Sequence, residues 1–440
     1  NGRLSMSDQK VFNRWIVVVG AILIQLCLGA IYAWSVFTKK ITEVGGDYGF
    51  SAKEAAWVFS AGLATFAVVM VIAGRLQARV GPKPIAMIGG AVLGLGYVLG
   101  GFLGNSFAAQ LICIGIIGGA GIGLAYVVPI AVGVKWFPDK KGMISGLAVA
   151  GFGFGATLWV KLAGSWFGGL LNTVSIFGLP GVQSVFVIYG IVFFVLVFIG
   201  SLVMVNPPEG YKPEGWEPPE PTDRSKATGT VDLTSGEMLR TPQFYFLWLM
   251  FVGSGLAGLM VIYCIRLFGI DALQASGAAD TETAAVIAGT AMAWYAILNG
   301  LGRIAWGTIS DKIGRKMALF LMCLFQGIIM MFFLKMGASK IGLIIGACII
   351  GFNFGGNFAL FPAATADFFG NKNVGTNYGW VFLAYGVAGI AGPQIAGYFK
   401  DAAQSGDVSA WTTPFIIAGL SCIVAAVIAL LLRAPKGHQA

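Results

Sequence analysis

The chain has 440 residues, of which 57% are hydrophobic and 11% are charged, and its formal net charge is +9. A soluble domain carries about a quarter charged residues, so this composition excludes an ordinary soluble protein and indicates a polytopic membrane protein. The positive charge lies in the connections between apolar stretches. It therefore gives no support to a nucleic-acid partner.

Apolar runs long enough to cross a bilayer recur along the whole chain. A helix needs about 20 apolar residues to cross a hydrocarbon core of about 30 Å. The sequence therefore predicts an all-α protein with twelve transmembrane helices, near residues 15–38, 54–74, 84–104, 107–135, 142–166, 183–205, 243–267, 284–309, 317–336, 341–366, 374–399 and 411–432.

Lysine and arginine are unevenly distributed between the two sides of this arrangement. Most of the 28 fall in alternate connections that share a side with the N-terminus. Cytoplasmic loops retain such residues, so we expect a multi-pass protein of the cytoplasmic (inner) membrane with both termini in the cytoplasm. We expect no cleavable signal, because Asn1–Lys10 is polar and the first apolar run is long enough to span. Met6 is a candidate natural start.

The residue content argues against an enzyme. All six cysteines fall in apolar spans without a metal-ligand spacing, and the one histidine, His438, is in the tail. No nucleophile motif or pair of carboxylates stands out. We therefore expect no catalysis, no metal and no cofactor.

A Pro-rich segment divides the chain into two halves. Residues 207–241 alternate prolines with acidic residues, a composition that cannot bury a core and is typical of a linker. We expect a six-helix bundle in residues 1–206, a cytoplasmic linker in 207–241 and a second six-helix bundle in 242–440.

The two halves repeat each other in register. Gly74–Gly81 recurs as Gly307–Gly314, with an offset of 307 − 74 = 233. Parallel repeats of six helices are typical of transporters that bind their substrate between the repeats, near the bilayer midplane. The same offset relates Pro129 to Pro362, Gly142 to Gly375, Gly146 to Gly379 and Gly153 to Gly386.

The segment from Gly307 to Lys316 resembles the signature loop of the major facilitator superfamily, and Gly74–Lys83 is its first-half copy. The resemblance implies the major facilitator fold and a latch between the bundles on the cytoplasmic side. Ala78 stands where the first copy would carry the acidic residue, so we expect the second loop to act alone. The gating residues that the resemblance implies are Asp311, Arg315, Arg75 and Arg79.

Four further motifs in order resemble the oxalate/formate antiporter family and the related bacterial monocarboxylate (lactate) transporters. The resemblance implies transport of small carboxylates across the cytoplasmic membrane. The motifs are Trp136–Gly142, Ser235–Phe244, Ala359–Pro362 and Asn377–Gly379.

Arg303 is the one arginine set deep inside an apolar stretch. Placing an arginine at bilayer depth costs roughly 2.5–3.5 kcal/mol, which a bound anion offsets. Tyr295 and Asn299 fall on the same helical face, so we expect two neutral donors beside one cation. By resemblance, Arg303 also takes the position of the family's substrate-binding arginine. The alternative is that Arg303 belongs to the latch and pairs with carbonyls or with Asp311.

The resemblance also implies a second cation in the eleventh helix of the oxalate carrier, and Tyr385 stands at that position. A dianion would leave one charge uncompensated in low dielectric, so we expect monocarboxylates of lactate or pyruvate size. Tyr126 and Tyr385 are the expected hydrogen-bond partners of the substrate. The aromatic residues that the resemblance places around the cavity are Tyr32, Tyr126, Phe152, Phe354, Phe358 and Phe382.

The mode of transport stays open, because no carboxylate falls at mid-membrane depth. Resemblance to lactate transporters suggests proton symport; exchange of one anion for another and facilitated flux are the alternatives. A transporter-like carboxylate sensor is a further alternative. We expect a monomer in the lipid bilayer, with a small carboxylate and a co-transported proton as its partners.

Overall fold

The computed structural model describes residues 13–41, 45–164, 166–179, 181–216, 232–402 and 407–433. Twelve of the helices in these ranges are long and apolar enough to span a membrane, which confirms the predicted number. The predictions for Asn1–Lys10, Met6 and His438 lie outside the described residues.

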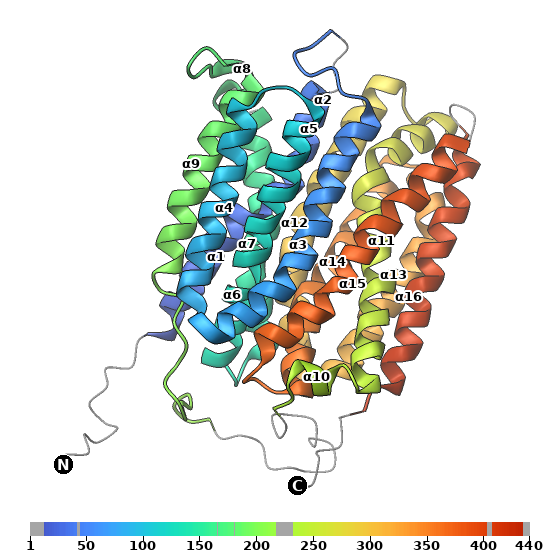
Figure 1. Cartoon of the computed structure of the whole chain (residues 1–440). Helices are drawn as coiled ribbons and strands as arrows, with labels where there is room; N and C mark the ends of the chain where they lie inside the picture. The colour runs from blue at the N-terminus through green and yellow to red at the C-terminus, as the bar shows by residue number, and fades with distance from the viewer. Residues whose placement is uncertain are drawn as a thin grey trace, which may run out of the picture.

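The first six spans form one bundle (Figure 1). Their connections carry short helical pieces, η3 (Trp166–Gly168) and α8 (Leu170–Thr173). The spans are α1 (Arg14–Leu28) continued by η1 (Gly29–Ala33) and α2 (Trp34–Ile41), α3 (Ala52–Val80), α4 (Pro82–Phe102), α5 (Phe107–Gln110) continued by η2 (Leu111–Gly118) and α6 (Gly119–Trp136), α7 (Lys141–Gly164), and α9 (Gly181–Ser201).

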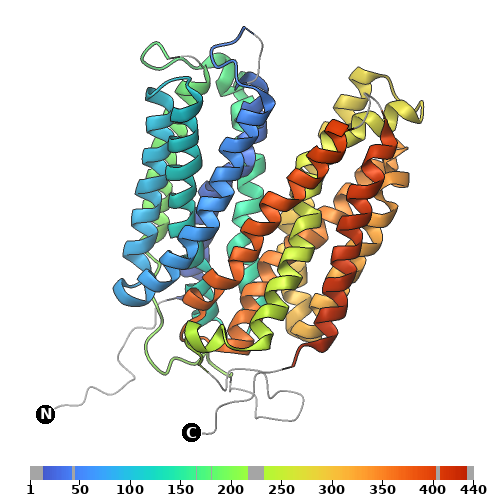
Figure 2. The ribbon, with the colours of Figure 1, turned by 45° about the vertical axis from the view of Figure 1, so that its right-hand side comes forward.

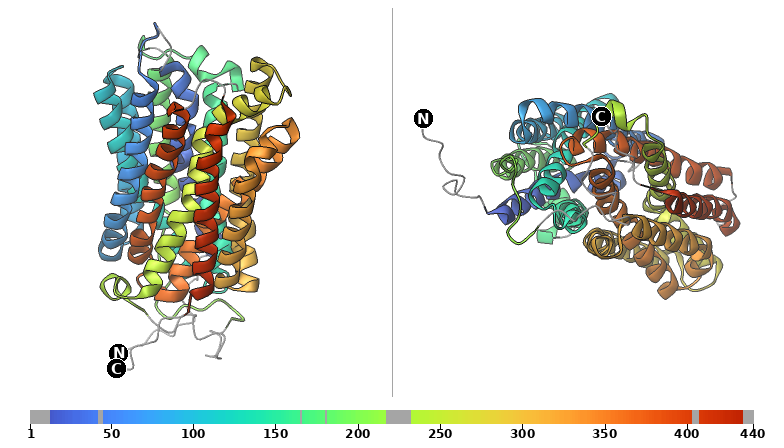
Figure 3. Two further views of the ribbon diagram at one scale, coloured as in Figure 1. Left: turned by 90° about the vertical axis from the view of Figure 1, so that its right-hand side faces the viewer. Right: turned by 90° about the horizontal axis from the view of Figure 1, so that it is seen from below.

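The last six spans form the second bundle, which stands beside the first in Figure 3. Between the bundles the chain forms the short helix α10 (Ser235–Met238). The spans are α11 (Pro242–Ala275), α12 (Thr281–Ile313), α13 (Arg315–Gly337), α14 (Lys340–Phe369), α15 (Val374–Ala402) and α16 (Thr412–Leu431), the last preceded by η4 (Val408–Trp411).

We call the end of the molecule that carries Gly81, Gly314 and α10 the linker end, and the opposite end the distal end. Figure 2 shows the two bundles close together at the linker end and spread apart at the distal end. Gly81 and Gly314 occupy equivalent positions in the repeat and have φ of 90° and 85°. Glycine tolerates this conformation, so each ends one span and turns the chain directly into the next.

Glycines also allow the bundles to meet at the linker end. A Cβ on Gly142 of α7 would lie 2.4 Å from the carbonyl oxygen of Gly307 in α12. A Cβ on Gly74 of α3 would lie 2.4 Å from the carbonyl oxygen of Gly375 in α15. Backbone can approach backbone this closely only where side chains are absent. The repeated glycines therefore form two cross-bundle contacts, α7 with α12 and α3 with α15.

Part of the predicted linker is ordered, unlike the expectation from its composition. Thr234 and Glu237 form a capping box on α10, and Met238 is buried. The Leu233 carbonyl accepts hydrogen bonds from Asn373 and Asn377 at the start of α15. These contacts fix the second part of the linker to the C-terminal bundle. Residues 217–231 lie outside the described residues, and the division into 1–206, 207–241 and 242–440 stays a prediction.

Candidate functional site

Arg303 lies inside α12 and is fully buried. Its Nε and Nη2 donate to Oδ1 of Asn299 at 3.1 and 3.0 Å, and its Nη1 donates to the carbonyl of Val149 at 2.7 Å. Val149 belongs to α7 of the other bundle. Asn299 is one helical turn away, so α12 itself sets the plane of the guanidinium.

These contacts leave part of the guanidinium available to a ligand. The group has five N–H donors, and its hydrogen bonds to described residues use three of them. One N–H remains on each of Nη1 and Nη2. Among the described residues, no carboxylate forms an ion pair with Arg303. A buried charge with neutral partners is suited to binding an anion.

The alternative role for Arg303 is in the latch, where it would pair with carbonyls or with Asp311. This role matches the structure in one respect only. A main-chain carbonyl of the other bundle, that of Val149, does accept a hydrogen bond from the guanidinium. Asp311 instead accepts from the backbone N–H groups of Gly142 and Met143, at 2.9 and 2.8 Å. It also pairs with Arg315 at 2.7 Å. Asp311 therefore accepts hydrogen bonds from backbone N–H groups at the start of α7, and it is not the partner of Arg303.

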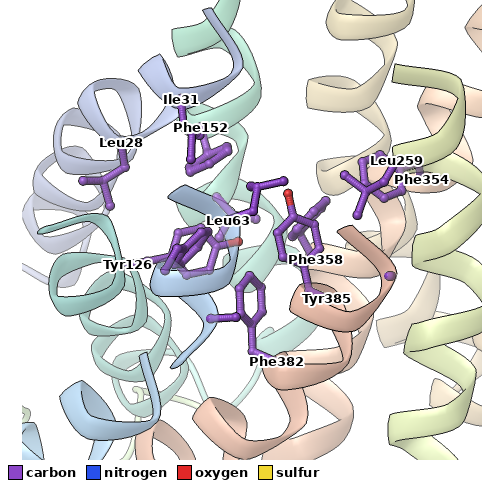
Figure 4. Close-up of a cluster of buried hydrophobic side chains, with 14 of the residues drawn as sticks. Leu28, Ile31, Leu63, Tyr126, Phe152, Leu259, Phe354, Phe358, Phe382 and Tyr385 are labelled. Carbon is purple, nitrogen blue, oxygen red and sulfur yellow. The ribbon is translucent and has the colours of Figure 1, made fainter. Parts of the chain in front are cut away.

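Aromatic rings surround the guanidinium. Its Cζ lies 4.2 Å from the ring centroid of Phe358 and 5.4 Å from that of Phe152. Tyr126 packs edge-on against Phe152 with centroids 5.5 Å apart, and it lies 5.3 Å from Phe382. Figure 4 shows Tyr126, Phe152, Phe358, Phe382 and Tyr385 gathered in one cluster that both bundles supply. Four of the six predicted rings thus lie in this cluster together with Tyr385. The other two, Tyr32 and Phe354, contact it through Phe152 and Phe358, with ring centroids 5.1 and 5.3 Å apart. Together these rings form an apolar enclosure.

Two further rings of this cluster escaped the sequence analysis. The ring centroid of Phe66 in α3 lies 4.9 Å from those of both Tyr126 and Phe382. The ring centroid of Phe251 in α11 lies 6.3 Å from that of Tyr385. The repeat offset was a signal for the first of them, because 299 − 233 = 66. Phe66 therefore occupies in the first half the position that Asn299 occupies in the second. No comparable signal pointed to Phe251.

The tyrosine hydroxyls differ in the partners they have. The hydroxyls of Tyr32 and Tyr385 form a hydrogen bond that joins the two bundles. The hydroxyl of Tyr126 is buried and has no hydrogen-bond partner among the described residues. An unpaired buried hydroxyl costs about 1–3 kcal/mol, which a polar ligand atom would relieve. Of the two predicted partners of a substrate, Tyr126 is available and Tyr385 is engaged.

Tyr295 does not supply the free donor that the sequence predicted. Its hydroxyl donates to the carbonyl of Gly258 in α11 at 3.1 Å. The ring of Phe354 fills the space where a side chain at Gly258 would stand, with a carbon 2.0 Å from the position of that Cβ. Because Gly258 lacks a side chain, Tyr295 and Phe354 pack against α11. Tyr295 therefore holds helices of one bundle together, and Asn299 faces Arg303 with its acceptor oxygen.

The predicted gating residues lie at the linker end, where Asp311 and Arg315 belong to a network of charges. Arg315 donates to Asp367 at 2.7 Å, and Asp367 accepts from Lys141 of the other bundle at 2.9 Å. The sequence analysis did not include Lys141 or its ion pair in the site. Arg75 lies over the ring of Trp380 at 5.1 Å, whereas Arg79 is exposed. The second-half loop contacts the opposite bundle through Asp311, and the equivalent first-half position, Ala78, has no carboxylate to form such a contact.

Comparison with known proteins supports this architecture. The family model described as Major Facilitator Superfamily matches residues 15–393 and 278–440. The chain is 30% identical over 380 residues to the uncharacterized MFS-type transporter YhjX of Escherichia coli, covering 86% of each chain. It is 26% identical to the oxalate:formate antiporter of Oxalobacter formigenes, covering 97% of this chain and 93% of that one. It is 27% identical to apicoplast pyruvate carrier 1 of Toxoplasma gondii, covering 84% and 81%.

Solved structures share the fold at low sequence identity. The MFS transporter FucP in the outward conformation superposes with a TM-score of 0.64 at 16% identity, covering 94% of this chain and 99% of that one. The proton:xylose symporter XylE bound to 6-bromo-6-deoxy-D-glucose gives 0.67 at 14% identity, covering 94% of each chain. Twelve spans in two repeated bundles, matched by a family model over most of the sequence, show that the chain belongs to the major facilitator superfamily of membrane transporters.

Proposed function

We propose that this protein carries small monocarboxylates of lactate or pyruvate size across the cytoplasmic membrane by alternating access. The observation that carries the proposal is Arg303, a fully buried cation whose described partners are the neutral oxygens of Asn299 and Val149. Two of its N–H groups have no acceptor among the described residues and can donate to a carboxylate. The unpaired hydroxyl of Tyr126 is the second polar group that a ligand in this enclosure would meet.

The charge of the site favours a substrate with one negative charge. Tyr385 occupies the position where the resemblance implies a second cation, and its hydroxyl is engaged by Tyr32. Phe152 and Phe358 present apolar and π surfaces to the guanidinium. A dianion would bring a second carboxylate into this low-dielectric enclosure without a counter-ion, at a cost of several kcal/mol. A molecule with one carboxylate and a short organic chain fits this site, because the carboxylate neutralises Arg303 and the chain contacts the apolar walls.

Transport needs the site to open to each side in turn. The contacts at the linker end close that side, and the bundles diverge at the distal end. We assign the linker end to the cytoplasm because most lysines and arginines of the connections lie there. Breaking the α7–α12 and α3–α15 contacts would open the same site to the cytoplasm.

For the coupling, proton symport is the form we propose. Among the described residues, the carboxylates lie in connections or near helix ends, and Asp311 and Asp367 are ion-paired at the linker end. A proton that accompanies the substrate would therefore travel with the carboxylate itself or through the linker-end pairs. Exchange of two carboxylates is the second candidate, because the chain resembles the oxalate:formate antiporter over 97% of its length.

Uptake into proteoliposomes tests the proposal. Purified protein should accumulate labelled lactate or pyruvate, and an inward proton gradient should increase the initial rate. Uptake that requires an internal carboxylate and ignores the proton gradient would assign the protein to exchange. Failure of every small monocarboxylate both to be taken up and to raise the melting temperature of the protein would refute the function.

A further inference from the structure

An ion pair joins the two bundles at the linker end, between Lys141 at the start of α7 and Asp367 near the end of α14. The ammonium lies 2.9 Å from the carboxylate, and both side chains are buried. Asp367 also pairs with Arg315 at 2.7 Å, and Arg315 pairs with Asp311. The second bundle therefore holds three of these four charges, and the first bundle supplies the single charge of Lys141. Opening of the linker end would separate Lys141 from the other three.

The repeat shows that closure at this end does not require charges. Because 374 − 233 = 141 and 367 − 233 = 134, Lys141 corresponds to Val374 and Asp367 to Val134. Val134 of α6 and Val374 of α15 belong to one buried apolar cluster, so the equivalent contact between the bundles is apolar. Well-packed apolar side chains stabilise such a contact as well as a buried ion pair does, or better. Closure alone therefore does not explain why charges stand at Lys141 and Asp367.

Lys141 lies on the stripe of α7 that leads to Arg303. Lys141, Ser145 and Val149 are spaced by four residues, so they follow one face of the helix. The Val149 carbonyl accepts from Arg303, and Lys141 is 149 − 141 = 8 residues away, or roughly 12 Å along the axis. Ser145 lies midway, and its buried hydroxyl has no hydrogen-bond partner among the described residues. An anion that moves along this face from Arg303 meets a hydroxyl and then a second cation.

Separation of the bundles removes the counter-ion of Lys141. Asp367 stays with Arg315, because both belong to the second bundle. Asp139, the carboxylate two residues before Lys141, already accepts from both Nη1 and Nη2 of Arg14, at 2.9 and 3.5 Å. A cation that loses a close carboxylate partner gains from binding another one. A carboxylate that leaves the central site is suited to this exchange, because it is the same chemical group as the side chain it replaces.

We propose that Lys141 is a second binding residue for the substrate, whose carboxylate takes the place of Asp367 when the linker end is open. The inference rests on the proposed function, because it takes a small monocarboxylate as the substrate and the opening of the linker end as a step of transport. The substrate and Asp367 compete for one ammonium group. A bound substrate therefore keeps the linker end open, and its departure lets the ion pair form again and close that end.

Binding measurements distinguish this role from closure alone. Asp367→Asn and Lys141→Gln each break the ion pair, but only Asp367→Asn leaves the cation to the substrate. The Kd for lactate should be about tenfold lower in Asp367→Asn than in Lys141→Gln, since a hydrogen bond to a charged group has about this effect. The readout is the rise in melting temperature over a lactate titration, in a nonionic detergent without added phospholipid.

The double variant Lys141→Gln/Asp367→Asn is the matched control for these measurements. Asp367→Asn also removes one partner of Arg315, so Arg315 is a second cation that could hold the anion. The double variant should bind lactate as weakly as Lys141→Gln does. Binding as tight as that of Asp367→Asn would assign the anion to Arg315 and overturn the inference. Equal Kd values in the two single variants would overturn it as well.

A pair of valines tests whether the charge is needed once closure is preserved. Lys141→Val/Asp367→Val gives this contact the residues that the equivalent contact already has. The linker end should still close, so a cysteine in Ser145→Cys should react with a charged thiol reagent no faster than before. The maximal rate of lactate uptake should nevertheless fall several-fold, whereas Lys141→Arg, which keeps the cation, should retain it. Wild-type uptake by the valine pair would show that the charge at Lys141 does not bind the substrate.

The failure of this inference differs from the failure of the proposed function. If the wild type takes up lactate and the two single variants bind it equally, Lys141 serves only to close the linker end, and the function stands. If no small monocarboxylate binds to the wild type or is taken up by it, the function fails and this inference fails with it.

Discussion

The side-chain oxygen of Asn299 accepts hydrogen bonds from both Nε and Nη2 of Arg303, at 3.1 and 3.0 Å. The amide is neutral, so it fixes the plane of the guanidinium without cancelling its charge. A carboxylate at the same place would satisfy the geometry and the charge together. The choice of an amide therefore leaves a positive charge, oriented and buried, for a ligand to neutralise.

Replacing Arg303 tests the centre of the proposed site. Arg303→Ala removes the cation, and Arg303→Lys keeps the charge but loses the planar fork that contacts Asn299 and Val149. We expect both variants to lower the rate of lactate uptake by about 30-fold or more, because truncating one partner of a buried charge pair costs about 2–5 kcal/mol. Gel filtration and melting temperature show whether each variant is folded. Wild-type uptake by either folded variant would remove Arg303 from the site.

Replacing Asn299 tests the neutral partner. In Asn299→Asp the new carboxylate should pair with Arg303 and compete with the substrate, so we expect the Kd for lactate to rise about tenfold or more. The readout is the increase in melting temperature over a lactate titration, which follows the fraction of protein bound. Asn299→Ala, which removes the amide without adding a charge, is the control. A Kd unchanged in Asn299→Asp would mean that the substrate does not bind at this guanidinium.

Tyr385 should set the preference for the charge of the substrate. Tyr385→Lys places a second cation in the aromatic cluster and removes the hydrogen bond to Tyr32. We expect this variant to bind oxalate more tightly relative to lactate, because a second carboxylate then has a counter-ion. Tyr385→Phe separates the loss of the hydroxyl from the added charge and should not gain oxalate binding. Competition of unlabelled oxalate against labelled lactate measures the change. Oxalate and lactate binding equally well to the wild type would contradict the argument.

The lengths of the apolar runs were sufficient to predict the twelve spans found among the described residues, including the helix that carries Arg303. Apolar run length and sharp turns are both local properties, because a bilayer requires long apolar helices and a sharp turn requires glycine at Gly81 and Gly314. Contacts between bundles are different in kind. The Val149 carbonyl below Arg303 and the pairing of Tyr32 with Tyr385 depend on which helix faces meet. No spacing along one helix contains that information, and a main-chain carbonyl has no sequence signature at all.

The same limit explains the error at Tyr295. Helical periodicity correctly placed Tyr295, Asn299 and Arg303 on one stripe of α12. It did not show that α11 approaches closely enough at Gly258 to accept the phenol proton. The sequence analysis missed the contacts between the end of the linker and α15 for a related reason. The composition of the linker predicted a segment without a core, but two asparagines at the start of α15 hold its Leu233 carbonyl.

The glycine contact between α7 and α12 should control opening at the linker end. A Cβ on Gly307 would lie 2.1 Å from the carbonyl oxygen of Gly142, a distance that forces the helices apart. We therefore expect Gly307→Ala to shift the population toward molecules open at the linker end.

Ser145 on α7 is fully buried, so a cysteine there reports the change. In the Ser145→Cys background, Gly307→Ala should increase the rate of modification by a charged thiol reagent several-fold, since a shift of about 1 kcal/mol changes a population about fivefold. Gly289→Ala adds a methyl group where no atom lies within 4 Å and should leave the rate unchanged. Equal rates in all three proteins would show that this close approach does not hold the linker end shut.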